Sequence, residues 1–363
     1  MTNISAATKW DLDTPSLVVD LDLLDQNIAR MAQFFRAKGV NWRPHTKGQK
    51  IPEIAHLQLA AGALGITCAK LSEAEVMAQE GIRDILIANQ VVGEQKASRL
   101  AKLLDVADVI VAVDSLVNGE QLSQAANSRD QRLRVVVEVD NGIDRAGVPP
   151  GERALSLAQA LDDLPGLRFV GLMAWEAHCL GLPPDKRQSC CDEAVGKLVA
   201  TADLCRNAGL PVEIVSCGGT GTYWISAFAP GITEVEAGGG IYGCGRYRRD
   251  FGVDLEPALT ILTTVTSRPD ANRIICDAGF KSSGRGFGEP EILGCGVVES
   301  FKSSAEHGSI FLAQDNPSPR PGEQIEFVPG YSDATVFLHD YLYGVRAGRV
   351  EVVWPVVGRG KLQ

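Results

Sequence analysis

The chain has 363 residues, of which 45% are hydrophobic and 22% charged, so it can build a large core and is not an intrinsically disordered protein. Its formal net charge of -10 argues against a nucleic-acid-binding protein that works through a basic surface. No run of about 18 uninterrupted apolar residues, the length of a membrane-spanning helix, occurs in it. We therefore expect a small-molecule partner, and neither nucleic acid nor a membrane.

The nine cysteines are odd in number and scattered, mostly in apolar runs or beside glycines. Cys190 and Cys191 are adjacent, which is not the Cys-x-x-Cys spacing of metal or redox motifs. The first residues contain neither the basic region nor the apolar region of an export signal. These features predict reduced thiols and a cytoplasmic protein.

Short β-branched runs alternate with longer segments of helical periodicity over the first two thirds of the chain. Eight runs are predicted to be strands: 40–43, 64–68, 85–88, 109–113, 135–139, 169–173, 212–215 and 233–236. Helices are predicted over 22–36, 71–79, 95–104, 154–161 and 189–208. Eight such units predict an α/β fold, a closed (β/α)8 or TIM barrel, over residues 20–249.

After residue 249 the pattern changes to strand-like runs separated by turns rich in Gly, Pro and Ser. These runs cover 259–265, 273–276, 309–312, 324–327 and 349–353. An opening strand over 16–19 precedes the first barrel helix and is expected to pair with this module. The sequence thus predicts a second, C-terminal all-β domain, made of residues 1–19 and 250–363, that covers the active site.

The loops after the last two barrel strands are rich in glycine. They read Ser216-Cys-Gly-Gly-Thr-Gly-Thr-Tyr223 and Ala237-Gly-Gly-Gly-Ile-Tyr-Gly243. Glycines here let backbone N–H groups approach a phosphate, although one such loop alone is equally well explained by a tight turn. Two loops together favour a phosphorylated ligand, with the hydroxyls of Ser216, Thr220 and Tyr223 as further candidate donors.

Lys47 follows the first predicted strand, in the segment Arg43-Pro-His-Thr-Lys47. A lysine that is partly removed from water at a barrel mouth loses its proton more easily and can react with an aldehyde. A lone lysine after a strand is more often a solvated surface group. Combined with a phosphate site, however, Lys47 predicts pyridoxal 5'-phosphate as the cofactor.

Four segments in order along the chain resemble the D-threonine aldolase and D-serine dehydratase family, which belongs to the alanine-racemase-like, fold-type III pyridoxal-phosphate enzymes. They are the lysine segment, Asp140-Asn-Gly-Ile-Asp-Arg145, the loop that begins at Ser216, and Asp277-Ala-Gly-Phe-Lys281. The resemblance implies that Lys47 carries the cofactor. It also implies roles for Arg145 near the phenolic oxygen, Trp175 beside the ring in place of a common tyrosine, and the backbone of Gly218, Gly219, Gly238 and Gly239 around the phosphate.

The metal motif of the family is altered in this chain. Relatives carry His-x-Asp or His-x-Cys near the C-terminus, whereas Tyr331 stands here in place of the histidine and Asp333 remains. One carboxylate and one phenol suit Mg²⁺ or Ca²⁺ better than Mn²⁺ or Zn²⁺, so metal dependence stays open. Tyr331 could act as an acid or base, as a tyrosine does in alanine racemases, only with a depressed pKa.

The resemblance implies an enzyme, a pyridoxal-phosphate-dependent lyase that acts on D-β-hydroxy-α-amino acids. Retro-aldol cleavage to glycine and an aldehyde is favoured, because Asp333 resembles the aldolase form of the metal pair. Dehydration, as of D-serine or D-3-hydroxyaspartate, and metal-independent racemisation are the alternatives, and a noncatalytic cofactor carrier fits the two-domain chain less well. His178, after the sixth strand, is either a general base or a structural histidine. The resemblance further implies a homodimer.

Overall fold

The computed structural model describes residues 8–363, and its residues cluster into two compact units. The first unit contains the residues up to 30, 48–53 and 239–360, and the second contains 31–47, 54–238 and 361–363. The domain limits expected from the sequence, with a barrel over 20–249, stay a prediction.

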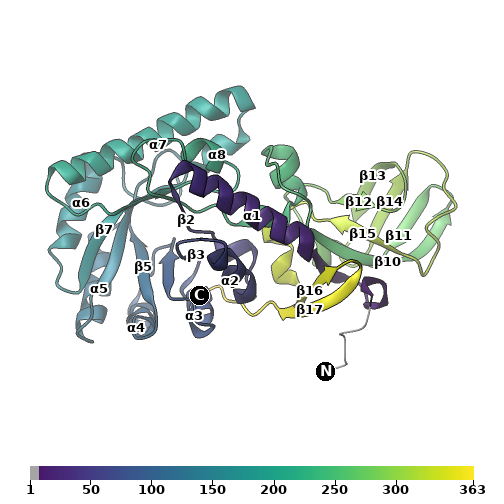
Figure 1. The fold of residues 1–363 in the computed structure, drawn as a ribbon, viewed down its shortest axis with the longest axis horizontal. Helices are drawn as coiled ribbons and strands as arrows, with labels where there is room; N and C mark the ends of the chain where they lie inside the picture. Colours follow the sequence, from purple (N-terminus) through teal and green to yellow (C-terminus); the bar gives the residue numbers. More distant parts are fainter. Residues whose placement is uncertain (1–7) are drawn as a thin grey trace. The chain divides into compact units, whose positions relative to one another are not determined.

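The second unit is built on eight parallel strands, in the order β2-β9-β8-β7-β6-β5-β4-β3. Figure 1 labels β2, β3, β5 and β7 of this sheet. A parallel bridge between His45 and Thr67 links the two ends of this order, so the sheet closes on itself. The fold confirms the predicted (β/α)8 barrel. The strands are β2 (Asn41–Trp42), β3 (Ile66–Cys68), β4 (Asp84–Ile87), β5 (Asp108–Val113), β6 (Leu133–Glu138), β7 (Leu167–Met173), β8 (Ile214–Cys217) and β9 (Glu234–Val235).

Helices alternate with these strands, as the sequence periodicity predicts. They are α2 (Pro52–Ala60), α3 (Leu71–Gln79), α4 (Glu94–Leu103), α5 (Leu116–Asn127), α6 (Glu152–Asp162), α7 (Pro184–Asn207) and α8 (Tyr223–Ser226), with the turns η2 (Thr46–Gly48) and η3 (Ala177–Gly181). The first helix, α1 (Leu21–Lys38), has its first residues, up to 30, in the first unit and the rest in the second. No bounds for α2 or α5 were predicted from the sequence. Ser115 precedes α5, and its side chain caps the helix by accepting a hydrogen bond from the N–H of Asn118.

One face of the parallel sheet carries a continuous apolar cluster. Leu86, Ile110, Ala112 and Val136 from three neighbouring strands are buried in it. Alternate residues of a strand face the same side, so Glu138 follows Val136 on this face at the carboxyl end of β6. Apolar side chains thus give way to a charged side chain at the carboxyl ends of the strands. In this fold, that end of the barrel carries the catalytic loops.

The first unit contains a sheet with the strand order β13-β14-β11-β10-β1-β16-β17, and β15 pairs with β10 and β12. The opening strand β1 pairs antiparallel with β10 and parallel with β16, which confirms that it joins the C-terminal strands. The strands are β1 (Ser16–Asp20), β10 (Leu259–Asp270), β11 (Arg273–Cys276), β12 (Glu291–Leu293), β13 (Val298–Ser303), β14 (Gly308–Leu312), β15 (Gln324–Val328), β16 (Tyr341–Arg346) and β17 (Arg349–Pro355). Short helical segments are η1 (Lys9–Asp11), η4 (Gly239–Tyr242), η5 (Arg246–Asp250), α9 (Phe280–Ser283), η6 (Ser332–Ala334) and η7 (Val336–Leu338).

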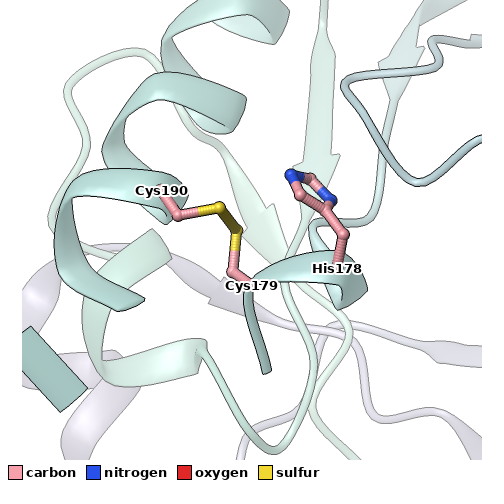
Figure 2. A group of neighbouring side chains, drawn as sticks. All are labelled: His178, Cys179 and Cys190. Atoms are coloured by element: carbon pink, nitrogen blue, oxygen red, sulfur yellow. A yellow bond between two sulfur atoms is a disulfide. The ribbon is translucent and has the colours of Figure 1, made fainter. Parts of the chain in front are cut away.

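The cysteines differ from expectation in one respect. Cys179 on η3 and Cys190 on α7 form a disulfide, with their Cα atoms 5.7 Å apart (Figure 2). The prediction that all the thiols are reduced is therefore wrong for this pair, because the turn η3 packs against α7 and brings together residues that are 11 positions apart. The other seven cysteines are buried free thiols.

Every helix within residues 8–363 is too short or too polar to cross a lipid bilayer.

Candidate active site

Three residues predicted to bind the cofactor meet at one indole ring. Lys47, on the turn after β2, places its Nζ 4.9 Å from the centroid of the Trp175 ring. The guanidinium carbon of Arg145 lies 5.4 Å from the same centroid. The Nε1 of Trp175 is buried and has no hydrogen-bond partner among residues 8–363. The indole N–H is therefore a donor available to a ligand.

A buried carboxylate holds Arg145 in place. Glu138, at the end of β6, accepts a hydrogen bond from Nη2 of Arg145 over 3.2 Å and a second one from the side-chain amide of Gln90. The Glu138 side chain is almost fully buried, whereas that of Arg145 is about half exposed. Arg145 is thus anchored at one end and can still reach a ligand. Arg145 was predicted from the sequence, whereas its partner Glu138 was not.

Glu176 organises the glycine-rich loop after β8. It is fully buried, and its Oε2 accepts a hydrogen bond from the Gly218 N–H over 3.3 Å. Its Oε1 accepts bonds from the hydroxyls of Thr222, over 2.7 Å, and Ser226. The Gly219 N–H donates to the Thr222 hydroxyl over 3.2 Å. The two amides expected to bind phosphate therefore already have partners inside the protein, and Glu176, which was not predicted, supplies the central acceptor.

The glycines of this region are required by close approaches. Gly218 has a φ of +75°, which favours glycine. A Cβ at Gly219 would lie 2.9 Å from Nε1 of Trp175, and one at Gly238 would collide with the backbone of His45. These residues leave room for the indole and for the segment before Lys47. His45 also accepts a weak hydrogen bond of 3.4 Å from the Lys47 N–H, which positions the lysine turn.

A second buried carboxyl group lies close enough to Lys47 for the two charges to interact. Glu236, directly after β9, accepts a hydrogen bond from the Ser216 hydroxyl over 3.0 Å. Burial raises the pKa of Glu236 to about 8, opposed by the Ser216 bond and by the positive charges of Lys47 and Arg43, while Glu234 raises it further. The raised pKa favours the protonated form of Glu236 at neutral pH. Sequence analysis identified Ser216 but not the carboxyl group that it contacts.

Arg43, the first residue of the lysine segment, has a structural role. Its guanidinium is fully buried, with Nε 2.9 Å from Glu234 and Nη1 paired to Asp84. These contacts tie β2 to β9 and to the start of β4. The ion pair with Arg43 also compensates the buried negative charge of Glu234, which lies two residues before Glu236.

The hydroxyl donors predicted in the glycine-rich loop have mixed environments. Thr220 is buried. The ring of Tyr223 packs against Phe34 and Phe35, with centroid distances of 4.9 and 5.7 Å, so it contributes to an aromatic cluster. A role for either hydroxyl in phosphate binding stays a prediction.

His178 and Asn141 carry buried polar atoms without partners in the part of the chain that the structure describes. These are Nδ1 of His178 and both terminal atoms of the Asn141 amide. The imidazole lies beside Gly142, where an added Cβ would be 3.0 Å from Nε2. The two side chains follow β7 and β6, on the same end of the barrel as Lys47. Unsatisfied buried groups at strand ends are typical of a ligand site.

The first unit holds the Asp333 cluster, formed by Asp333, Tyr331 and Tyr247. The phenols of Tyr331 and Tyr247 donate to the two Asp333 oxygens over 3.1 and 3.3 Å. A Cβ at Gly239 would lie 2.6 Å from the Tyr247 hydroxyl, so Gly239 makes room for this cluster. Burial, followed by the charge of Asp333, raises the pKa of Tyr331. That direction is opposite to the one a racemase-type base requires.

The Asp333 cluster is a poor ligand set for a borderline metal. Both carboxylate oxygens accept bonds from phenols that burial keeps protonated. His339, six residues on, uses its Nε2 for a 2.7 Å hydrogen bond with the Ser282 carbonyl. Asp333 is therefore the one strong ligand that this cluster offers, and no step of the chemistry below depends on a metal there.

Comparisons with known proteins identify the family. Residues 19–245 match the model of the alanine racemase N-terminal domain, and residues 258–345 match a putative serine dehydratase domain. A D-threonine aldolase from Arthrobacter sp is 38% identical over 96% of this chain and 93% of its own length. A 3-hydroxy-D-aspartate aldolase from Paracoccus denitrificans is 35% identical over 97% and 93%.

A solved structure agrees with these similarities. The crystal structure of D-threonine aldolase from Filomicrobium marinum matches with a TM-score of 0.93 and 34% identity, over 99% of both chains. A D-threo-3-hydroxyaspartate dehydratase is also among the relatives. The family implies pyridoxal 5'-phosphate as cofactor. The chain accordingly belongs to the alanine-racemase-like family, within the pyridoxal-phosphate-dependent lyases that include the D-threonine aldolases.

Proposed function

We propose that this chain cleaves D-β-hydroxy-α-amino acids by a retro-aldol reaction that yields glycine and an aldehyde. The observation that carries this proposal is His178, an imidazole after β7 whose buried Nδ1 has no partner within residues 8–363. Cleavage begins when a base removes the proton of the substrate's β-hydroxyl, and a neutral imidazole is suited to that step. The similarity to two aldolases of D-hydroxyamino acids supports the same reaction.

The residues of the barrel fit the implied cofactor. Lys47 would hold it through its aldehyde, Trp175 offers an unpartnered N–H, and Arg145 would approach the phenolic oxygen. The Gly218 and Gly219 amides of the loop over 218–223 already have partners, so the remaining groups of this loop, among them the Thr220 hydroxyl, would hold the phosphate. When bound, pyridoxal 5'-phosphate stabilises the negative charge that develops at the substrate's α-carbon.

Glu236 is the side chain we assign to the nitrogen of the cofactor ring. Pyridoxal-phosphate sites place an acidic side chain or an arginine at this nitrogen. Glu236 is buried directly after β9, and the positive charge of Lys47 lowers its pKa. With a pKa of about 8, it can hold a proton there at neutral pH, and Ser216 keeps the carboxyl group oriented.

Two other reactions start from the same substrates. One relative is a D-threo-3-hydroxyaspartate dehydratase. Dehydration requires an acid or a metal at the β-hydroxyl in addition to a base for the α-proton. Racemisation requires a second acid or base, and the raised pKa of Tyr331 speaks against its use as one. If Asp333 binds a cation at all, we expect weak Mg²⁺ or Ca²⁺ rather than tight Mn²⁺ or Zn²⁺.

The decisive experiment incubates the purified holoenzyme with D-threonine and, separately, with D-serine. Retro-aldol activity gives glycine and an aldehyde, dehydration gives a keto acid and ammonia, and racemisation gives the L-enantiomer. Keto acid or L-enantiomer as the main product would contradict the proposal.

A variant series separates cofactor binding from base catalysis. Lys47→Ala should abolish turnover together with the visible absorption of lysine-bound cofactor. His178→Ala should keep that absorption and lose about 10²- to 10⁴-fold in kcat, the usual contribution of a general base. Full activity of His178→Ala would show that another group takes the hydroxyl proton.

A further inference from the structure

We propose that His178, Cys179 and Cys190 form a binding site for one soft divalent cation, such as Zn²⁺, and that the Cys179–Cys190 disulfide closes this site. One ligand atom from each residue lies within 4.8 Å of the other two (Figure 2). The three residues come from η3 and the first turns of α7. Two thiolates and one imidazole are a ligand set that suits zinc.

The dimensions of the cluster are close to those of a zinc site. Zn–S bonds of about 2.3 Å and Zn–N bonds of about 2.0 Å put tetrahedral ligand atoms about 3.5 to 3.8 Å apart. The histidine-to-sulfur separations of up to 4.8 Å therefore need to shorten by about 1 Å, while the two sulfurs, bonded to each other in the disulfide, must move apart. Opening the disulfide frees both sulfur side chains to rotate, which makes this adjustment possible. Three protein ligands would leave a fourth position open to water.

His178 is suited to bind a cation because its buried Nδ1 has no hydrogen-bond partner within residues 8–363. Cys179 is fully buried, while Cys190 and His178 remain partly exposed, so an ion can reach the cluster from solvent. The buried thiols of Cys191 and Cys205 lie on the same helix but are not part of this cluster of ligand atoms.

The redox step balances with a dithiol as the reductant. Two electrons and two protons pass from the dithiol to the Cys179–Cys190 disulfide, which becomes two thiols while the dithiol becomes a disulfide. Zn²⁺ binding then displaces both thiol protons. In the reverse direction, a disulfide oxidant such as oxidised glutathione takes two electrons from the two thiolates and, with two protons from water, becomes two thiols. The protein disulfide re-forms and Zn²⁺ is released.

Occupation of this site would act on catalysis through His178. An imidazole bound to zinc has lost the lone pair that would accept the substrate's hydroxyl proton. Reduced, zinc-loaded enzyme should therefore lose activity, and oxidation should restore it. This consequence rests on the proposed function, whereas the binding of zinc does not.

The test compares two preparations of the full-length holoenzyme, one treated with oxidised glutathione and one with a dithiol, both freed of reagent. Alkylation and mass spectrometry should find Cys179 and Cys190 disulfide-bonded in the first preparation. After incubation with Zn²⁺ and desalting, elemental analysis should find about one additional zinc per chain in the reduced preparation only. Zinc should also protect Cys179 and Cys190 of the folded reduced enzyme from iodoacetamide.

Two variants control for other zinc sites and for general damage. Cys190→Ser, which replaces one of three ligands, should weaken zinc binding by at least about 100-fold. Cys205→Ser, which changes a buried thiol on the same helix, should bind zinc as the parent enzyme does. Equal zinc in both redox forms, unweakened binding by Cys190→Ser, or failure of the glutathione-treated enzyme to form the disulfide would each overturn the site.

Activity measurements distinguish the site from the proposed function. Zinc bound at full activity would refute the role of His178 as base and leave the metal site standing. An active aldolase whose reduced form binds no extra zinc would refute the site and leave the function standing.

Discussion

Replacing Glu236 by glutamine should make the protein more stable at high pH and change it little at low pH. The physical reason is the carboxyl group's burial, which raises its pKa from 4.5 to about 8 in the folded chain. Between these two values the folded state binds a proton that the unfolded state has released. The free energy of unfolding of the parent protein must then fall as pH rises from about 4.5 towards 8.

The size of the effect follows from the two pKa values. A difference between 4.5 and about 8 corresponds to at most about 5 kcal/mol of stability, present in full below the unfolded pKa and lost above the folded pKa. Glutamine has nearly the same shape, can still accept the Ser216 hydrogen bond, and carries no titrating proton. We expect the stability advantage of Glu236→Gln over the parent to grow by about 2 to 5 kcal/mol between pH 5 and pH 9.

Urea unfolding of the cofactor-free chain at several pH values measures this directly. Comparing variant with parent at each pH cancels the contribution of the other titrating groups. Glu152→Gln, which removes an exposed carboxyl at the start of α6, is the matched control and should show no pH-dependent difference. An equal difference between Glu236→Gln and parent at pH 5 and pH 9 would refute the assignment of a raised pKa to Glu236.

Three further predictions concern other parts of the structure. Glu176→Ala removes the acceptor of three hydrogen bonds and should cost about 3 to 6 kcal/mol in urea unfolding, with Glu176→Gln losing less than half of that. Tyr331→His should restore a histidine beside Asp333 and raise Mn²⁺ affinity in a titration, whereas the parent should keep its activity in EDTA; tight stoichiometric manganese in the parent would contradict this. We also expect a homodimer by light scattering, and a fully active monomer would rule it out.

The sequence by itself determined the architecture of the barrel and where its reactive loops lie. Few other folds fit eight β-branched runs with helical segments between them, because neighbouring parallel strands must be joined by long crossover segments. Residues directly after such strands must share one end of the barrel, so Lys47, Arg145 and Trp175 could be grouped before any coordinates. Their proximity in the structure is what this rule predicts.

Helix α5, for which no bounds were predicted from the sequence, shows weak local helix propensity. Its sequence includes Asn118 and Gly119, which are weak helix formers. In the fold, Gly119 lies where Leu161 of α6 approaches so closely that a Cβ would collide with it. Gly119 thus lowers the helix propensity of α5, but its lack of a side chain lets α6 pack closely against it.

Tertiary structure alone decided the roles of the buried carboxyl groups and of the disulfide. Whether Glu176 is a surface charge or the acceptor that shapes a loop depends on donors more than 40 residues away, at Gly218, Thr222 and Ser226. The protonation of Glu236 likewise depends on how completely the barrel excludes water from it. The burial of a single carboxyl group and its distant partners leave no periodic signal in the chain, because both arise only when segments far apart in sequence are brought together.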